Sequence, residues 1–89
     1  MKTKITYSND SDYGVQTLEL TVANESNFDM LLEAMQDELD FYNITYVGCP
    51  QEDENSFTDS FAICKDEMLK ADFMKTMREI IKGAKKSLK

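Results

Sequence analysis

Hydrophobic and polar residues alternate along two segments near the start of the chain. In residues 15–23, Leu18 and Leu20 fall on one face and polar side chains fall on the other. Residues 2–8 alternate in the same way and are rich in β-branched and aromatic types. A period of two predicts strands, and residues 9–14 between them have the Asn, Asp, Ser and Gly composition of a turn. We therefore expect an antiparallel hairpin.

Two longer segments instead repeat their hydrophobic residues at the helical period of about 3.6. The first helix is predicted from Ser26, which forms a capping box with Asp29, to about Tyr42. The second is predicted over residues 67–87, with Asp66 as its cap. The expected buried stripes are Phe28, Leu31, Leu32, Met35, Leu39 and Tyr42 in the first helix, and Phe73, Met77, Ile80, Ala84 and Leu88 in the second.

Between the helices the pattern predicts two further strands. Residues 44–49 form a short candidate strand that ends at Pro50, and residues 51–55 form an acidic loop. Residues 56–64 alternate again, although Asp59 interrupts the apolar face. The order ββαββα predicts an α+β fold, with a four-stranded, mainly antiparallel sheet and two helices packed on one of its faces.

The chain has 89 residues, of which 42% are hydrophobic, enough for the core of one small domain. We expect residues 1–89 to form a single acidic α+β domain. If both helices cover the same face of the sheet, the other face carries Thr17, Glu19 and Thr21, and it contacts either water or a partner.

Charge is distributed unevenly along the chain. From Ile5 to Cys64 there are thirteen Asp and Glu but no Lys, Arg or His. The cations lie at the two ends, and the formal net charge is −7. A surface of one sign repels itself, so its use generally lies in solubility or in attracting a partner of opposite charge. The distribution therefore favours binding to a basic protein.

Five carboxylates of the first predicted helix share one arc of about 120° on a helical wheel and extend about 22 Å along the axis. Their spacing, one charge per about 4–5 Å, is of the same order as the ~3.4 Å spacing along one strand of B-DNA. Like charges four residues apart cost a helix roughly 0.2–0.5 kcal/mol per pair. The alternative is an ordinary solvated face. These residues, called the acidic stripe below, are Glu25, Asp29, Glu33, Asp37 and Asp40.

Further candidate contacts lie beside the acidic stripe. Met30, Ala34 and Phe41 form a predicted apolar edge on the side away from the core, suited to a protein interface because Met adapts its shape and aromatic residues anchor contacts. Strand loops or a dimer mate are alternative occupants of this edge. The loop acids Glu52, Asp53 and Glu54 could extend the negative surface.

The second predicted helix carries a basic stripe opposite its buried face. These cations oppose the helix dipole near its C-terminal end and partly neutralise the acidic body. A membrane-binding or nucleic-acid-binding helix is the alternative, and a homodimer held by opposite charges is another. The basic stripe consists of Lys75, Arg78, Lys82, Lys85 and Lys86.

No motif for catalysis, a cofactor or a metal is found in the sequence. There is no His, and the three glycines do not form a phosphate-binding loop. Cys49 and Cys64 lack metal-site spacing, and the expected strand register holds them too far apart for a disulfide, so we expect reduced, mostly buried thiols. We therefore expect a protein that is not an enzyme and that needs no cofactor or metal.

Nothing in the sequence reads as a signal peptide or a membrane span, so we expect a cytoplasmic protein. The negative charge argues against direct binding to nucleic acid or to an anionic membrane. In size, charge and α+β build the chain resembles the small acidic inhibitors, such as anti-restriction and anti-CRISPR proteins, with which phages and mobile elements block host DNA-binding machinery. The resemblance implies a DNA mimic that binds a basic nucleic-acid-binding protein, in the host cytoplasm if phage-encoded. The alternative is a homo-oligomeric structural or regulatory module whose acidity serves solubility.

Overall fold

The computed structural model describes residues 1–10 and 14–88, and within them the chain forms two helices and five strands. The predicted turn at 9–14 therefore lies partly outside the described residues. In chain order the elements are β1 (Lys4–Asp10), β2 (Val15–Val22), α1 (Glu25–Phe41), β3 (Thr45–Tyr46), β4 (Gln51–Asp53), β5 (Ser56–Cys64) and α2 (Lys70–Ser87).

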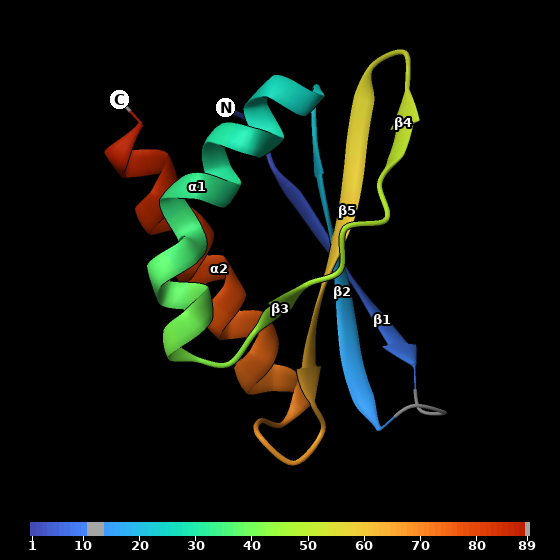
Figure 1. Ribbon diagram of the computed structural model, residues 1–89, viewed down its shortest axis with the longest axis vertical. Coiled ribbons are helices and arrows are strands. Elements are labelled where there is room, and N and C mark those ends of the chain that lie inside the picture. The colour runs from blue at the N-terminus through green and yellow to red at the C-terminus, as the bar shows by residue number, and fades with distance from the viewer. Residues whose placement is uncertain (11–13, 89) are drawn as a thin grey trace.

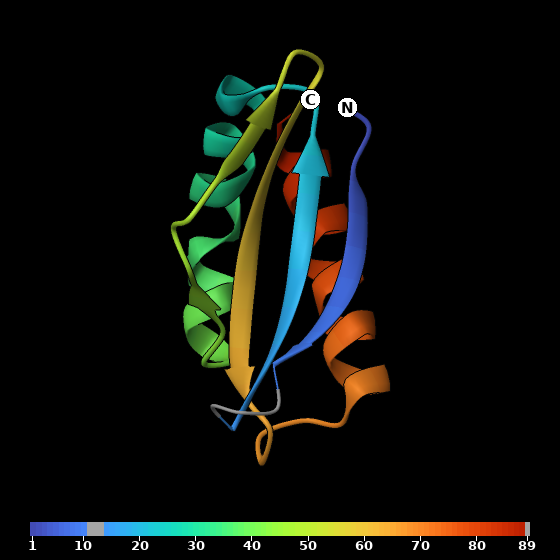
Figure 2. The ribbon, with the colours of Figure 1, turned by 90° about the vertical axis from the view of Figure 1, so that its right-hand side faces the viewer.

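The sheet forms one layer and the two helices form the other, against the same face (Figure 1). In Figure 2 the sheet is in front, with α1 behind β3 and β5 and with α2 behind β1 and β2. The helices run in opposite directions (Figure 1). The predicted α+β fold with both helices on one face is confirmed, and it gives the apolar side of each element a common core.

All strand pairs are antiparallel, in the order β1, β2, β5, β3, and β4 also pairs with β5. Along β2, alternate residues from Gln16 to Val22 are buried beneath the helices. Thr17, Glu19 and Thr21 lie on the opposite face, as predicted, where the hydroxyl oxygens of Thr21 and Thr58 are 2.8 Å apart. The face without helices is therefore polar.

The segment between α1 and β5 differs from the prediction. The expected strand 44–49 is reduced to the two residues of β3, and the expected loop 51–55 contains β4, which forms a hairpin with β5. Between β3 and β4, Gly48 has a φ of 79°, which favours glycine. The edge of the sheet is thus interrupted, and the sheet has five strands instead of four.

Both helices begin at residues other than those predicted. Asn24, not Ser26, caps α1, because its side-chain oxygen accepts a hydrogen bond of 2.8 Å from the backbone N–H of Asn27. The second helix begins at Lys70 instead of just after Asp66, and no side chain caps it. The predicted helix types and lengths are nevertheless close to those observed.

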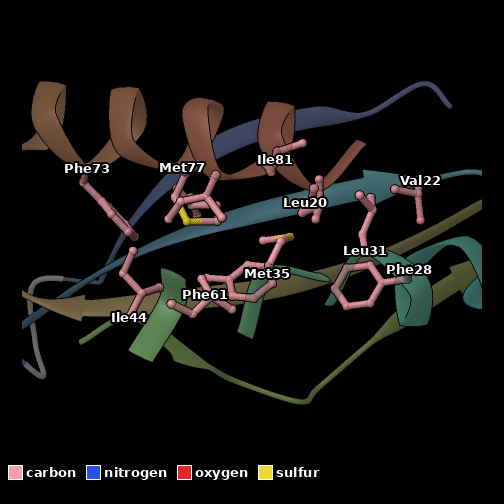
Figure 3. Packing of buried hydrophobic residues seen from close by; sticks show 14 of the residues in the cluster. Leu20, Val22, Phe28, Leu31, Met35, Ile44, Phe61, Phe73, Met77 and Ile81 are labelled. Atoms are coloured by element: carbon pink, nitrogen blue, oxygen red, sulfur yellow. The ribbon is translucent and has the colours of Figure 1, made fainter. Parts of the chain in front are cut away.

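The core lies between the sheet and the helices (Figure 3). The ring centroid of Phe28 in α1 lies 5.1 Å from that of Phe57 and 6.2 Å from that of Phe61 in β5. The predicted stripes are buried or half-buried except at Leu88, which is 39% exposed. The buried hydrophobic residues are Leu18, Leu20, Val22, Phe28, Leu31, Met35, Leu39, Ile44, Phe57, Phe61, Ile63, Phe73, Met77, Ile80, Ile81 and Ala84.

One polar residue, Gln16, lies on the buried face of β2. Its side-chain oxygen accepts a hydrogen bond of 2.9 Å from the hydroxyl of Tyr7 in β1. Its side-chain nitrogen donates to the backbone carbonyl of Met68, in the connection between β5 and α2, over 2.5 Å. The Lys70 ammonium lies 4.7 Å from the centroid of the Tyr7 ring. Gln16 therefore links the start of α2 to the β1–β2 hairpin.

The two cysteines are free thiols, as predicted, but the expectation that they are mostly buried is wrong. Cys49 is exposed in the connection between β3 and β4. Cys64 is the last residue of β5 and is exposed at the end of the strand's alternating pattern. Neither thiol contributes to the core.

Candidate protein-binding surface

The acidic stripe lies on an exposed side of α1. The helix buries Phe28, Leu31, Met35 and Leu39 against the sheet. All five stripe carboxylates belong to exposed residues. On a helical wheel their arc is centred about 135° from the buried side chains, so they point away from the core. The predicted stripe is therefore accessible along the length of α1.

The helix that carries the acidic stripe is held in place, because its opposite side is packed against the core. Met35 and Leu31 have no exposed surface at all, and Leu39 is 1% exposed. The cap at Asn24 satisfies a backbone N–H group in the first turn of the helix. The carboxylates are thus presented on a preformed scaffold, in spite of the repulsion among them.

The structure brings one of the three loop acids to the same side of the molecule as α1. Glu52 is paired with Phe57 in the β4–β5 hairpin, so the two side chains share the face that the helices cover. The Phe57 ring contacts Phe28 in the first turns of α1. Glu52 is exposed, and its pairing with Phe57 places it at the end of the sheet where the first turns of α1 pack.

The other two loop acids are placed differently. Asp53 is paired with Ser56 and therefore faces the polar side of the sheet, away from α1. Glu54 lies in the turn that joins β4 to β5, and both residues are exposed. The three predicted acids thus surround the tip of one hairpin and do not form a single row with the acidic stripe.

Buried Asp59, which the alternating pattern had marked as irregular, holds the interrupted edge of the sheet in place. It is 1% exposed. Its carboxylate accepts hydrogen bonds of 2.5 Å from the Tyr46 hydroxyl, 3.1 Å from the Cys49 N–H and 2.7 Å from the Ser60 N–H. Three donors compensate the loss of water around the carboxylate. Asp59 therefore positions the connection that leads into the acidic hairpin.

The Asp59 network also changes the acidity of Tyr46. Burial raises the pKa of Tyr46 from 10.0 to about 12, with further contributions from its hydrogen bond to Asp59 and from the negative charges of Asp59 and Asp29. The Tyr46 hydroxyl is thus protonated at neutral pH and serves as a donor.

The predicted apolar edge beside the stripe is not continuous. Met30 is 45% exposed and Phe41 is 76% exposed, whereas Ala34 is half-buried. Met30 and Phe41 are eleven residues apart, or about 16 Å along the helix axis. The Phe41 ring packs edge-on against Tyr42, with centroids 4.9 Å apart. The two exposed side chains are therefore separate contact points.

Comparison of the chain with models of protein families, with curated proteins and with solved structures finds no match. Across the described residues, neither helix is long and apolar enough to cross a membrane. In the same part of the chain, no three His, Cys, Asp or Glu side chains gather closely enough to hold a metal ion. The exposed charges and apolar side chains of α1 are therefore the features that suggest a function.

Proposed function

We propose that this protein is a non-enzymatic inhibitor that occupies a basic nucleic-acid-binding site on a host protein, as phage-encoded DNA mimics of the anti-CRISPR or anti-restriction type do. The observation that supports this function best is the exposure of all five acidic-stripe carboxylates on one side of α1. Glu52, Asp53 and Glu54 of the β4–β5 hairpin are exposed and would supply further negative charge to the partner.

The chemistry of the acidic stripe suits a groove that normally holds phosphates. A basic groove is lined by Lys and Arg, and a row of carboxylates along one helix offers them charges at a spacing similar to that of a DNA strand. Because α1 is packed on its core side, little backbone conformational entropy is lost when the partner binds. The attraction between exposed charges falls as salt rises, so binding of this kind is salt-dependent.

The first test is a pull-down from host lysate at low salt, with the immobilised protein eluted by a salt gradient and its partners identified by mass spectrometry. We expect a nucleic-acid-binding protein that elutes at moderate salt. The purified partner is then titrated with labelled duplex DNA, and one equivalent of the inhibitor should displace the DNA. Enzymatic turnover of the DNA or of the partner would contradict the proposal.

A charge-reversal variant tests whether the acidic stripe carries the binding. The triple variant Asp29→Lys, Glu33→Lys and Asp37→Lys should lose capture of the partner, because like charges then face each other across the contact. These side chains are exposed, so the far-UV circular dichroism should stay unchanged.

The matched control makes the same change in net charge elsewhere. The triple variant Glu67→Lys, Asp72→Lys and Glu79→Lys alters three exposed acids that are outside the acidic stripe. It should retain most of the capture. Equal loss in both variants would show that only overall charge matters, and retained capture in the stripe variant would refute the proposed surface.

The alternative function is a homo-oligomeric structural or regulatory module. Phe41 favours it, because this aromatic side chain is 76% exposed at the end of α1, where a second copy could cover it. The alternative predicts a dimer by light scattering that becomes a monomer in Phe41→Ser. A strictly monomeric wild-type protein would exclude it.

A further inference from the structure

A second surface feature, opposite in charge to the acidic stripe, is a groove of about 870 Å³ that lies between the first half of α1, the second half of α2 and the start of β1. It lies at the end of the molecule where both ends of the chain are seen (Figures 1 and 2). Four of the five predicted basic-stripe residues line it: Arg78, Lys82, Lys85 and Lys86.

The charge of the groove stands out against the rest of the protein. None of its ten lining residues is Asp or Glu, although the chain as a whole has a net charge of −7. Arg78, Lys82 and Lys86 are exposed, and the half-buried Lys85 directs its ammonium to the hydroxyl of Thr3, 3.3 Å away. The groove is therefore a positive site on a negative molecule, and it favours an anionic occupant.

The cations form a row. From Arg78 to Lys86 the helix advances about 12 Å, with one cation facing the groove per turn at Arg78, Lys82 and then Lys85 or Lys86. A single carboxylate or phosphate group would engage only part of this row. A complementary ligand presents a row of anionic groups about one helical turn apart.

The remainder of the lining is mostly apolar. Ile81 is 4% exposed at the base of the groove, whereas Met1, Met30 and Leu88 are 47%, 45% and 39% exposed. Flexible thioether and aliphatic side chains of this kind adapt to an apolar partner surface. No Phe, Tyr or Trp lines the groove, so it offers no platform for stacking nucleic-acid bases.

We propose that this groove binds an acidic amphipathic helix of a partner protein. The apolar face of the helix covers Met30, Ile81 and Leu88, and carboxylates spaced three or four residues apart pair with the cations of α2. The charge complementarity and the combination of an apolar floor with one cationic wall select this ligand over a single anionic headgroup. None of the five acidic-stripe residues lines the groove, although Met30 belongs to the apolar edge beside the stripe.

The test uses a fluorescent helical peptide of about 18 residues, or five turns, with Leu along one face and Glu on the flanking positions. Binding of the peptide to the 89-residue protein is followed by fluorescence anisotropy. A second peptide with Lys in place of Glu, and a third with Ser in place of Leu, should both bind at least about tenfold more weakly, because each lacks one of the two complementary features. Equal binding of the Leu and Ser peptides would overturn the role of the apolar floor.

Two variants with the same charge change locate the site. Lys82→Glu should weaken binding of the acidic peptide about tenfold or more, since repulsion replaces attraction within the row. Lys75→Glu lies on the same helix and is exposed, but Lys75 does not line the groove, so binding should change less than about twofold. Met30→Asp should also weaken binding. Equal effects of the two Lys variants would overturn the proposal.

Two further probes test the competing occupants. Oligo-dT and vesicles of phosphatidylglycerol should bind more weakly than the acidic peptide and should not displace it. Tighter binding of either probe, lost in Lys82→Glu but kept in Lys75→Glu, would assign the groove to nucleic acid or to a membrane surface and would refute the helix. Unchanged circular dichroism confirms that each variant is folded.

Discussion

The β1–β2 hairpin and strand β5 each contain one polar residue on the face of the sheet that the helices bury. Both residues accept a hydrogen bond from a tyrosine hydroxyl, but Gln16 donates to the backbone whereas Asp59 accepts from it. Beneath α2, Gln16 of β2 bonds to Tyr7 of the neighbouring edge strand and to the backbone of Met68. On the α1 side, Asp59 of β5 bonds to Tyr46 of the other edge strand and to the backbone in the following connection. In both places a buried side chain holds an irregular connection against the sheet.

Gln16 and Asp59 differ because the backbone groups that they bind differ: one is a carbonyl and the other is an N–H. At Met68 a carbonyl points inward, and only a donor such as the amide of Gln16 can satisfy it. At Cys49 an N–H points inward, and together with the Tyr46 hydroxyl it requires an acceptor, which Asp59 supplies. The buried polar residues are therefore matched to the backbone around them, and exchanging the two kinds of side chain should be costly.

The largest effect is expected for Gln16→Glu. The new carboxylate would be buried beside the carbonyl of Met68, without the donor that now pairs with it, so the free energy of unfolding should fall by about 3 kcal/mol or more. Urea denaturation at pH 7 measures the loss. Protonation restores a donor, so the destabilisation should shrink at acid pH, and a loss independent of pH would contradict this explanation.

A smaller loss, about 1–3 kcal/mol, is expected for Asp59→Asn, because an amide offers one acceptor oxygen to donors that now share two. In native-state hydrogen exchange, the substitution should accelerate exchange of the backbone N–H groups of Val47 and Cys49 more than exchange of those in β1 and β2. Uniform acceleration across the sheet would mean that Asp59 supports the whole fold and not one edge.

The smallest effect on stability concerns Tyr46, the partner of Asp59, and is confined to alkaline pH. The pKa of Tyr46 is raised from 10.0 to about 12, so the folded state retains a proton that the unfolded state releases. The stabilisation is complete below pH 10 and is lost as pH rises from 10 to 12. Urea denaturation across this range should show a steeper decline for the wild type than for Tyr46→Phe, and parallel curves would contradict the shift.

The elements with a regular hydrophobic period were predictable from the sequence. Strand β2 and the buried stripes of both helices follow from alternation and from the 3.6-residue repeat, because burial of one face dictates both patterns. Strands of two and three residues, such as β3 and β4, are too short to show a period. Their positions depend on long-range hydrogen bonds to Asp59. Asp59 interrupts the alternating pattern of residues 56–64, and this interruption was the sequence signal that could have indicated them.

The candidate surfaces were predictable to different degrees. The acidic stripe depends on the spacing of residues along a single helix, and the sequence alone placed its five members on one arc. The groove depends on Met30, Ile81 and the start of β1 meeting in space, which the packing of three separate elements determines. A local pattern cannot reveal such a site, although the basic stripe of α2 indicated four of its residues.

The interruption between β3 and β4 also limits how copies of this protein could join by strand addition. Gly48 and Pro50 break the backbone ladder on that border of the sheet, so it offers no long template for a foreign strand. Across the described residues, β1 pairs only with β2 and leaves its other side open over seven residues. Among the described residues, β1 is therefore the long unpaired border of the sheet, and strand addition through β1 alone would join two copies.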